Sequence, residues 1–158
     1  VYGVGARTLS RATGLSERAA AQLIEAYWER NWAVKEVVNN IEIKKTLTGS
    51  KSELQWVRNP ISGFWHHLRT EKDIWSTINQ SSGVYCFDRW VYHLTRREIW
   101  PIAQFHDEVV VVSPLDKHQA EELEYDLEQA MVDTNAELKL NVELAIDVQF
   151  GDNYANIH

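Results

Sequence analysis

The stretch PIAQFHDEVVVVSP, residues 101 to 114, sets His106, Asp107 and Glu108 between two apolar runs. These runs predict two short strands, and the second, VVVV, is typical of a strand buried on both faces. A tight turn between such strands usually contains Asn-Gly or Asp-Gly, because those residues tolerate a positive φ. Two carboxylates and an imidazole in this turn therefore need a separate reason.

The segments after this turn predict a mixed α and β fold. An acidic helix should follow Pro114, and the alternating apolar residues of NVELAIDVQF, residues 141 to 150, predict a half-buried strand. The order is then strand, turn, strand, helix, strand. An α+β fold, with an antiparallel sheet backed by helices, follows most simply.

Helical spacing dominates the chain before the turn. Ser16 is the expected cap of a helix, and apolar periodicity continues until it fades near Leu47. Asn59-Pro60 and two glycines predict a loose hairpin or extended excursion over residues 48–70. Residues 71–98 return to helical spacing, with a bend or break expected at Gln80-Ser81-Ser82-Gly83. We find no linker that would divide the chain into two domains.

Composition is that of an ordinary globular protein: 158 residues, 44% hydrophobic and 25% charged. No apolar run approaches the roughly 18 to 20 residues of a membrane span, so we expect a cytoplasmic protein without membrane contact. The single cysteine, Cys86, is expected to be a small core residue. Core positions are also expected for most of the tryptophans at helical spacing: Trp28, Trp32, Trp75 and Trp90.

The charge is unevenly distributed along the chain. The net charge is -7, and residues 116–137 alone hold eight Asp or Glu against one Lys, so the rest of the chain is neutral. Residues 44–72 hold six Lys or Arg against two Glu, together with His66 and His67. This basic segment could face phosphate groups, or it could be a solvated loop.

The acidic turn could be a metal site or an exposed turn without a function of its own. Adjacent side chains of an extended chain point to opposite faces, so Asp107 and Glu108 cannot easily hold one ion together. One carboxylate at a hairpin tip suits Mg²⁺, which takes one or two carboxylates plus water and substrate phosphates. Phosphoryl transfer with paired metals needs a further carboxylate from elsewhere in the fold. An exposed acidic turn without function is the alternative.

The stretch QFHDEVVV resembles the third catalytic motif of the family A DNA polymerases, the group of bacterial DNA polymerase I and many phage replicases. The similarity continues in order along the chain. Residues 2–37 resemble the end of the fingers helix and the helices that follow it. Residues 71–91, EKDIWSTINQSSGVYCFDRWV, are similar to the long palm helix, and FGDNYANIH looks like the Gly-x-x-Trp-x-x-x-His ending of the family.

The resemblance implies roles for the residues of the turn. Asp107 would be a catalytic residue and a ligand of two Mg²⁺ ions, whose second carboxylate comes from another segment. Glu108 would be its acidic catalytic neighbour near the primer end. Gln104 and His106 would contact the primer terminus from the minor-groove side.

Other residues are carried over from two further motifs. Tyr2 and Gly3 match the Tyr-Gly near the nucleotide insertion site and templating base. Gln80 matches a minor-groove Gln of the palm helix, and Lys72 and Ser76 stand where the family has Arg and Asn. Their spacing of four places these three on one helical face, where they could share a DNA contact.

The resemblance also implies an architecture. Residues 1–47 would be the last fingers helices, residues 48–70 an excursion, and residues 71–158 the palm, in a single carboxyl-terminal portion of a polymerase. The stretch resembling Asp-Tyr-Ser-x-Ile-Glu, which carries the other metal-binding Asp, and the triphosphate-binding Lys are not in this sequence.

The implied activity is metal-dependent addition of deoxynucleotides to a primer 3′ end. The partners would be primer-template DNA, dNTP and a second polypeptide with the thumb, the early fingers and the first Asp motif. A non-catalytic, palm-like module that binds DNA or a replication protein is the alternative. Single-subunit RNA polymerases typically follow His-Asp with Ser, so Glu108 favours DNA synthesis.

Overall fold

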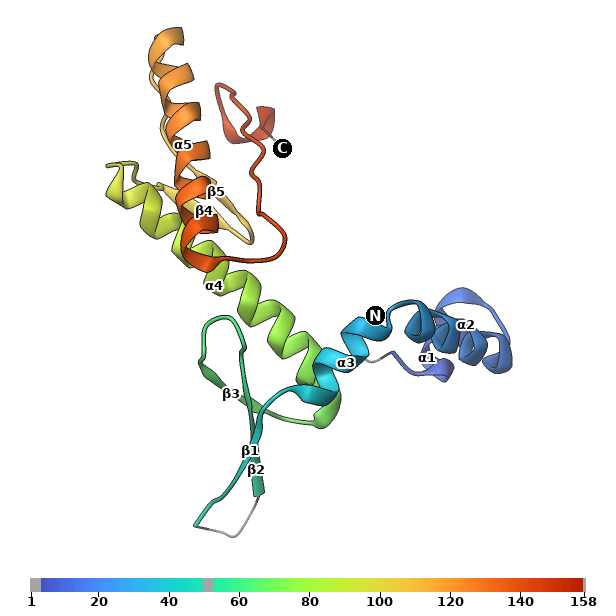
Figure 1. Cartoon of the computed structure of the whole chain (residues 1–158). Helices are drawn as coiled ribbons and strands as arrows, with labels where there is room; N and C mark the ends of the chain where they lie inside the picture. The colour runs from blue at the N-terminus through green and yellow to red at the C-terminus, as the bar shows by residue number, and fades with distance from the viewer. Residues whose placement is uncertain (1–3, 50–52, 158) are drawn as a thin grey trace. The chain divides into compact units, whose positions relative to one another are not determined.

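A computed structural model describes residues 4–49 and 53–157 of the chain, as two compact units, Val1–Ser82 and Gly83–His158. Helices and small antiparallel sheets make up both units (Figure 1), which confirms the predicted α+β class. The predicted domain boundaries at residues 47 and 70 stay predictions. The described helices are all too short or too polar to cross a bilayer.

The first unit begins with three helices, and Ser16 caps the second one as predicted. Its Oγ accepts a hydrogen bond from the Ala19 backbone N–H at 3.2 Å, which satisfies one of the free donors of the first turn. Gly14 ends the preceding helix with φ 73°, a conformation that favours glycine. The helices are α1 (Ala6–Thr13), α2 (Glu17–Arg30) and α3 (Trp32–Asn40).

A three-stranded antiparallel sheet follows α3, with the strand order β1-β2-β3. The predicted helical region up to Leu47 is too long, because α3 ends at Asn40 and the chain then enters the first strand. The loose hairpin predicted over residues 48–70 is a regular sheet in its described part. Its strands are β1 (Ile43–Leu47), β2 (Glu53–Arg58) and β3 (Trp65–Leu68).

One face of this sheet forms the core of the first unit. Val57 and Leu68 are buried there against Ile74 and Ile78, which belong to the long helix after the sheet. A short 3₁₀ helix, η1 (Glu71–Asp73), connects β3 to that helix, α4 (Ile74–Arg96).

Of the bend or break predicted at residues 80–83, the break is wrong, because helical conformation continues through these residues, and the bend stays a prediction. Buried Asn59, at the start of the β2–β3 loop, forms hydrogen bonds with the two serines in this part of α4. Its Nδ2 donates to Ser81 Oγ at 2.6 Å and to Ser82 Oγ at 3.0 Å. Its Oδ1 accepts from the backbone N–H groups of Ile61 and Ser62, at 2.8 and 3.0 Å. One side chain thus closes the loop and fastens it to the helix.

Replacing Asn59 with Ala should destabilise the first unit by about 2 to 3 kcal/mol, because fully buried donors and acceptors would lose their partners. Urea unfolding followed by circular dichroism measures the change. Asn40→Ala is the matched control, since exposed Asn40 donates a local hydrogen bond to the Glu36 carbonyl, and it should cost less than about 0.5 kcal/mol. Equal effects of the two substitutions would contradict the assigned importance of Asn59.

The second unit packs the later part of α4 against helix α5 (Lys117–Leu138) and the acidic hairpin. Its buried cluster comes from both helices and from the loop after α4, and the partly buried Val109 and Val111 of the hairpin region pack against it. The two hairpin strands are β4 (Ala103–Phe105) and β5 (Glu108–Val110), and a 3₁₀ turn, η2 (Tyr154–Asn156), lies near the end of the chain. The buried cluster consists of Trp90, Leu94, Ile99, Leu127, Ala130 and Met131.

Arg89 of α4 and Arg97, just after that helix, neutralise part of the acidic helix. The Arg97 guanidinium reaches Asp133 at 2.6 Å and Asp126 at 3.4 Å. Arg89 donates to Glu137 through Nη2 at 2.8 Å, and this hydrogen bond lowers the pKa of the Glu137 carboxyl. Three of the eight acidic residues counted in the sequence therefore act in helix packing.

Two strand predictions in this unit need correction. Val112, the last residue of VVVV, is 72% exposed, so that run is not buried on both faces. Residues 141–150 do not form a strand, although Leu144, Ile146 and Val148 are partly buried in the predicted alternation. The Asn135 side chain instead binds the Leu144 backbone N–H and carbonyl, at 2.9 and 2.8 Å. Apolar alternation predicted the buried side but not a pairing partner.

The predictions for single core residues have mixed outcomes. Cys86 is buried as expected, and burial raises the pKa of its thiol. Trp90 is buried, whereas Trp28 and Trp75 are half-buried and Trp32 is 64% exposed. The prediction that most of these tryptophans lie in the core is therefore wrong.

Candidate functional site

The acidic turn lies at the tip of the β4–β5 hairpin. Phe105 pairs with Glu108, which leaves His106 and Asp107 as a two-residue turn. His106 has φ 53°, the left-handed conformation that two-residue hairpins commonly require. This conformation costs a non-glycine residue about 1 kcal/mol, so His106 stands where Asn or Gly would be less strained.

Ring packing holds His106 in this conformation. Its imidazole contacts the Phe105 ring edge to face, with the ring centroids 4.6 Å apart. Such pairs contribute roughly 0.5 to 1.5 kcal/mol, enough to offset the backbone strain. Gln104, Phe105, His106 and Asp107 are all exposed. The structure thus brings together four of the predicted site residues, Gln104, His106, Asp107 and Glu108, in one hairpin with an accessible tip.

Glu108 is held by a residue from the end of the chain. The Tyr154 hydroxyl donates to Glu108 Oε1 at 2.8 Å. Desolvation and this hydrogen bond to the carboxylate both raise the pKa of Tyr154. The bond fixes one of the two acidic side chains and leaves Asp107 at the exposed turn.

Close packing in the tail sets the position of Tyr154. A Cβ added to Gly151 would lie 2.8 Å from Ile157 Cγ2 and 2.9 Å from Asn156 Cβ, so only glycine fits there without a shift. The sequence reasoning did not predict the contact between Tyr154 and Glu108. A signal was present, because Gly151 and Tyr154 occupy the Gly and Trp places of the Gly-x-x-Trp ending.

Replacing Glu108 with Gln should lower the pKa of Tyr154, although desolvation should still keep it above the ordinary tyrosine value. The raised pKa stabilises the folded state below pH 10, and that stabilisation is lost as the pH rises through the folded-state pKa. An NMR titration of the chain with labelled tyrosine rings measures the pKa of Tyr154, and the Tyr154→Phe variant identifies its resonance. An unchanged titration in the Gln variant would mean that the contact with Glu108 has no electrostatic effect.

The predicted DNA-facing residues of α4 lie at its start. Ser76 and Gln80 are one turn apart on the helix, whereas Lys72 lies before it in η1. The shared face of the three residues stays a prediction, because Lys72 lies in the short 3₁₀ turn that leads into the helix. Lys72 and Gln80 are exposed, and the Ser76 hydroxyl donates to the Asp73 carbonyl at 3.0 Å. Tyr2 and Gly3 lie outside the described residues.

The described carboxylates show how far this chain fits a Mg²⁺ site. No three His, Cys, Asp or Glu side chains gather into a possible metal site within residues 4–49 and 53–157. The exposed carboxylate of Asp107 nevertheless fits Mg²⁺, since this ion is often held by one or two carboxylates plus water and substrate phosphates. The described hairpin can therefore supply one part of such a site.

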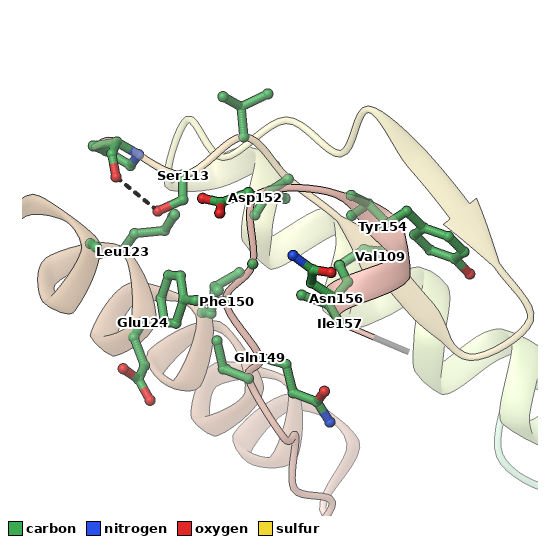
Figure 2. Close-up of a pocket in the computed structure, with 18 of the residues that line it drawn as sticks. Val109, Ser113, Leu123, Glu124, Gln149, Phe150, Asp152, Tyr154, Asn156 and Ile157 are labelled. Carbon is green, nitrogen blue, oxygen red and sulfur yellow. Dashed lines mark hydrogen bonds between the residues drawn. The ribbon is translucent and has the colours of Figure 1, made fainter. Parts of the chain in front are cut away.

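A cavity of about 1160 Å³ lies next to the hairpin in the second unit. Figure 2 shows that its lining comes from β5 (Val109), from α5 (Leu123 and Glu124) and from the tail (Phe150 and Tyr154). Valine side chains dominate the hairpin side, whereas the helix side combines Leu123 and Leu127 with charged residues. The cavity thus has one wall in common with the strand that carries Glu108.

The sequence matches the model described as DNA polymerase family A over residues 1–156. This match spans nearly the whole chain, and the chain therefore belongs to the family A DNA polymerases. A search of curated proteins found no significant match. Membership in the family implies primer-template DNA and dNTP as the class of substrates.

Proposed function

We propose that the chain forms part of the active centre of a template-directed DNA polymerase, which adds deoxynucleotides to a primer 3′ end. The observation that carries the proposal is the exposed Asp107 at a two-residue hairpin tip, within a chain that matches the family over residues 1–156. The runner-up is a non-catalytic DNA-binding or replication-interaction module. The present geometry favours catalysis because, within the described part of the chain, no ion pair or side-chain hydrogen bond of the exposed Asp107 carboxylate is found that would give it a role in folding.

Each of the hairpin residues would have a different role in the reaction. Asp107 would hold Mg²⁺ through its carboxylate, and the ion, when bound, offsets the negative charge that develops on the transferred phosphoryl group. Glu108, oriented by Tyr154, keeps a second negative charge close to the primer end. Gln104 and His106 would contact the primer terminus from the minor-groove side.

Residues outside the hairpin would bind the rest of the substrate. Gln80 and Lys72 are exposed and would contact the DNA minor groove and backbone, contacts that position the duplex without selecting its sequence. Ser76 is a weaker candidate because its hydroxyl already has a backbone acceptor. Tyr2 and Gly3 would lie near the incoming nucleotide and templating base.

The second metal-binding carboxylate must come from a segment that this sequence does not contain. The cavity beside β5 is a suitable place for this segment. In the described chain β5 pairs only with β4, and on the tail side Leu144, Ile146 and Val148 are partly buried. An added strand with alternating apolar residues would bury its apolar side in this cavity. We propose that the strand also brings the second Asp towards Asp107, from a second polypeptide that includes the thumb and early fingers.

Replacing Asp107 with Asn should reduce nucleotide incorporation about a hundredfold or more, because a neutral amide cannot hold the ion that offsets the developing charge. Primer extension with the complemented enzyme in Mg²⁺ measures the loss, and DNA binding should persist. Glu128→Gln is the control, since it removes the charge of an exposed carboxylate on α5, and incorporation should stay near normal. Normal incorporation by the Asn variant would exclude the catalytic assignment of Asp107.

The chain by itself should give no template-directed synthesis, since phosphoryl transfer depends on positioning and charge that one carboxylate cannot supply. Adding a polypeptide with the thumb, the early fingers and the first Asp motif should restore Mg²⁺-dependent extension of a primed template. Changing that Asp to Asn in the added polypeptide should abolish the gain. Synthesis by the 158-residue chain alone, or binding of the partner without synthesis, would refute the proposed division.

A further inference from the structure

The sheet of the first unit has an outer face that the core does not use. Side chains alternate between the two faces of a sheet, and Val57 and Leu68 belong to the buried face. The register places Lys44, Trp56 and His67 side by side across the three strands, and Arg58 beside Trp65. We define the outer face as Lys44, Thr46, Leu54, Trp56, Arg58, Trp65 and His67.

The aromatic side chains of the outer face are partly fixed before any ligand binds. Trp56 Nε1 donates to Thr46 Oγ1 at 2.9 Å, so its polar atom is satisfied within the sheet. On its other side the indole contacts the His67 ring, with centroids 5.3 Å apart and planes at 65°. Trp65 is 38% exposed and His67 is exposed. A ligand that stacks on these rings would lose little side-chain entropy in doing so.

The charges of the outer face are complementary to phosphate. Lys44 and Arg58 are its charged residues, and both are exposed cations. Arg58 lies 3.3 Å from Glu42 at the edge of the sheet, while the ion pair of Lys45 with Glu53 at 2.8 Å belongs to the opposite face. The basic segment noted in the sequence therefore presents both of its tryptophans, His67 and two of its cations on one accessible surface.

We propose that this outer face binds single-stranded DNA, with bases stacked on Trp56, Trp65 and His67 and with phosphates near Lys44 and Arg58. Aromatic side chains on an exposed antiparallel sheet, edged by cations, suit unpaired bases because every base has a face that can stack. Duplex DNA would use the cations and leave the rings without partners. Because the choice of DNA rests on the proposed polymerase function, the strand bound would be the unpaired template.

Affinity for single-stranded DNA tests the proposal directly. The whole chain is titrated with a fluorescently labelled oligothymidylate, and with a duplex hairpin for comparison, without metal or dNTP. Trp65→Leu should weaken binding of the oligothymidylate about tenfold, in keeping with a stacking contribution of roughly 1 to 3 kcal/mol per base, and Lys44→Gln should weaken it through the loss of one phosphate contact. Lys44→Gln should also reduce the salt dependence of binding, and Trp65→Phe should retain most of the affinity.

Matched controls lie on α3 in the same unit. Trp32→Leu removes a more exposed tryptophan, and Lys35→Gln removes an exposed lysine, so both should leave the affinity unchanged. Equal losses in the control variants, equal losses for the duplex, or no affinity for the oligothymidylate would overturn the proposal. Asp107→Asn should bind the oligothymidylate normally. The outer face and the catalytic assignment can therefore fail independently, because one is read from binding and the other from incorporation.

Discussion

Packing of Val109 and Val111 against the core around Leu94 is the constraint on which the acidic turn depends. The β4–β5 hairpin is short, so these two side chains determine which face of its second strand is buried. Alternation then places Glu108 on the other face, and the register leaves two residues for the turn. A slip of one residue would turn Glu108 towards the core and the valines towards water. Burial of two methyl-rich side chains therefore positions a carboxylate that is itself only partly buried.

A buried polar residue does the comparable work in the first unit. Asn59 joins the loop after β2 to the first turns of α4, so the sheet and the helix share one side chain. Hydrogen bonds of this kind depend more strongly on geometry than apolar contacts do. The sheet can thus keep its outer face uncovered, since its inner face is fixed by Val57 and Leu68 and its loop by Asn59. The inner face of the sheet therefore contributes stability, and the outer face stays accessible.

Local sequence signals predicted the helices and strands that depend on interactions between residues close together in the sequence. Ser16 as a cap, the two strands around the acidic turn and the acidic helix after Pro114 all need only near neighbours, and all are present. Residues 141–150 failed as a strand because apolar alternation reports which side chains prefer burial, while a strand also needs a backbone partner. The contact of Tyr154 with Glu108 spans 46 residues, and no periodicity encodes it. Geometry shows an exposed Asp107, and resemblance alone gave it a catalytic meaning.

Because Cys86 is buried within α4, its reaction with a thiol reagent can report how often this part of the chain opens. It is the single cysteine of the sequence, and its raised pKa keeps it in the unreactive thiol form while the helix is packed. A thiol reagent would therefore modify the chain only during openings that expose this helix. The modification rate, followed by mass, reports how often the second unit opens and how much a ligand or partner suppresses that opening. No engineered label is required for such a measurement.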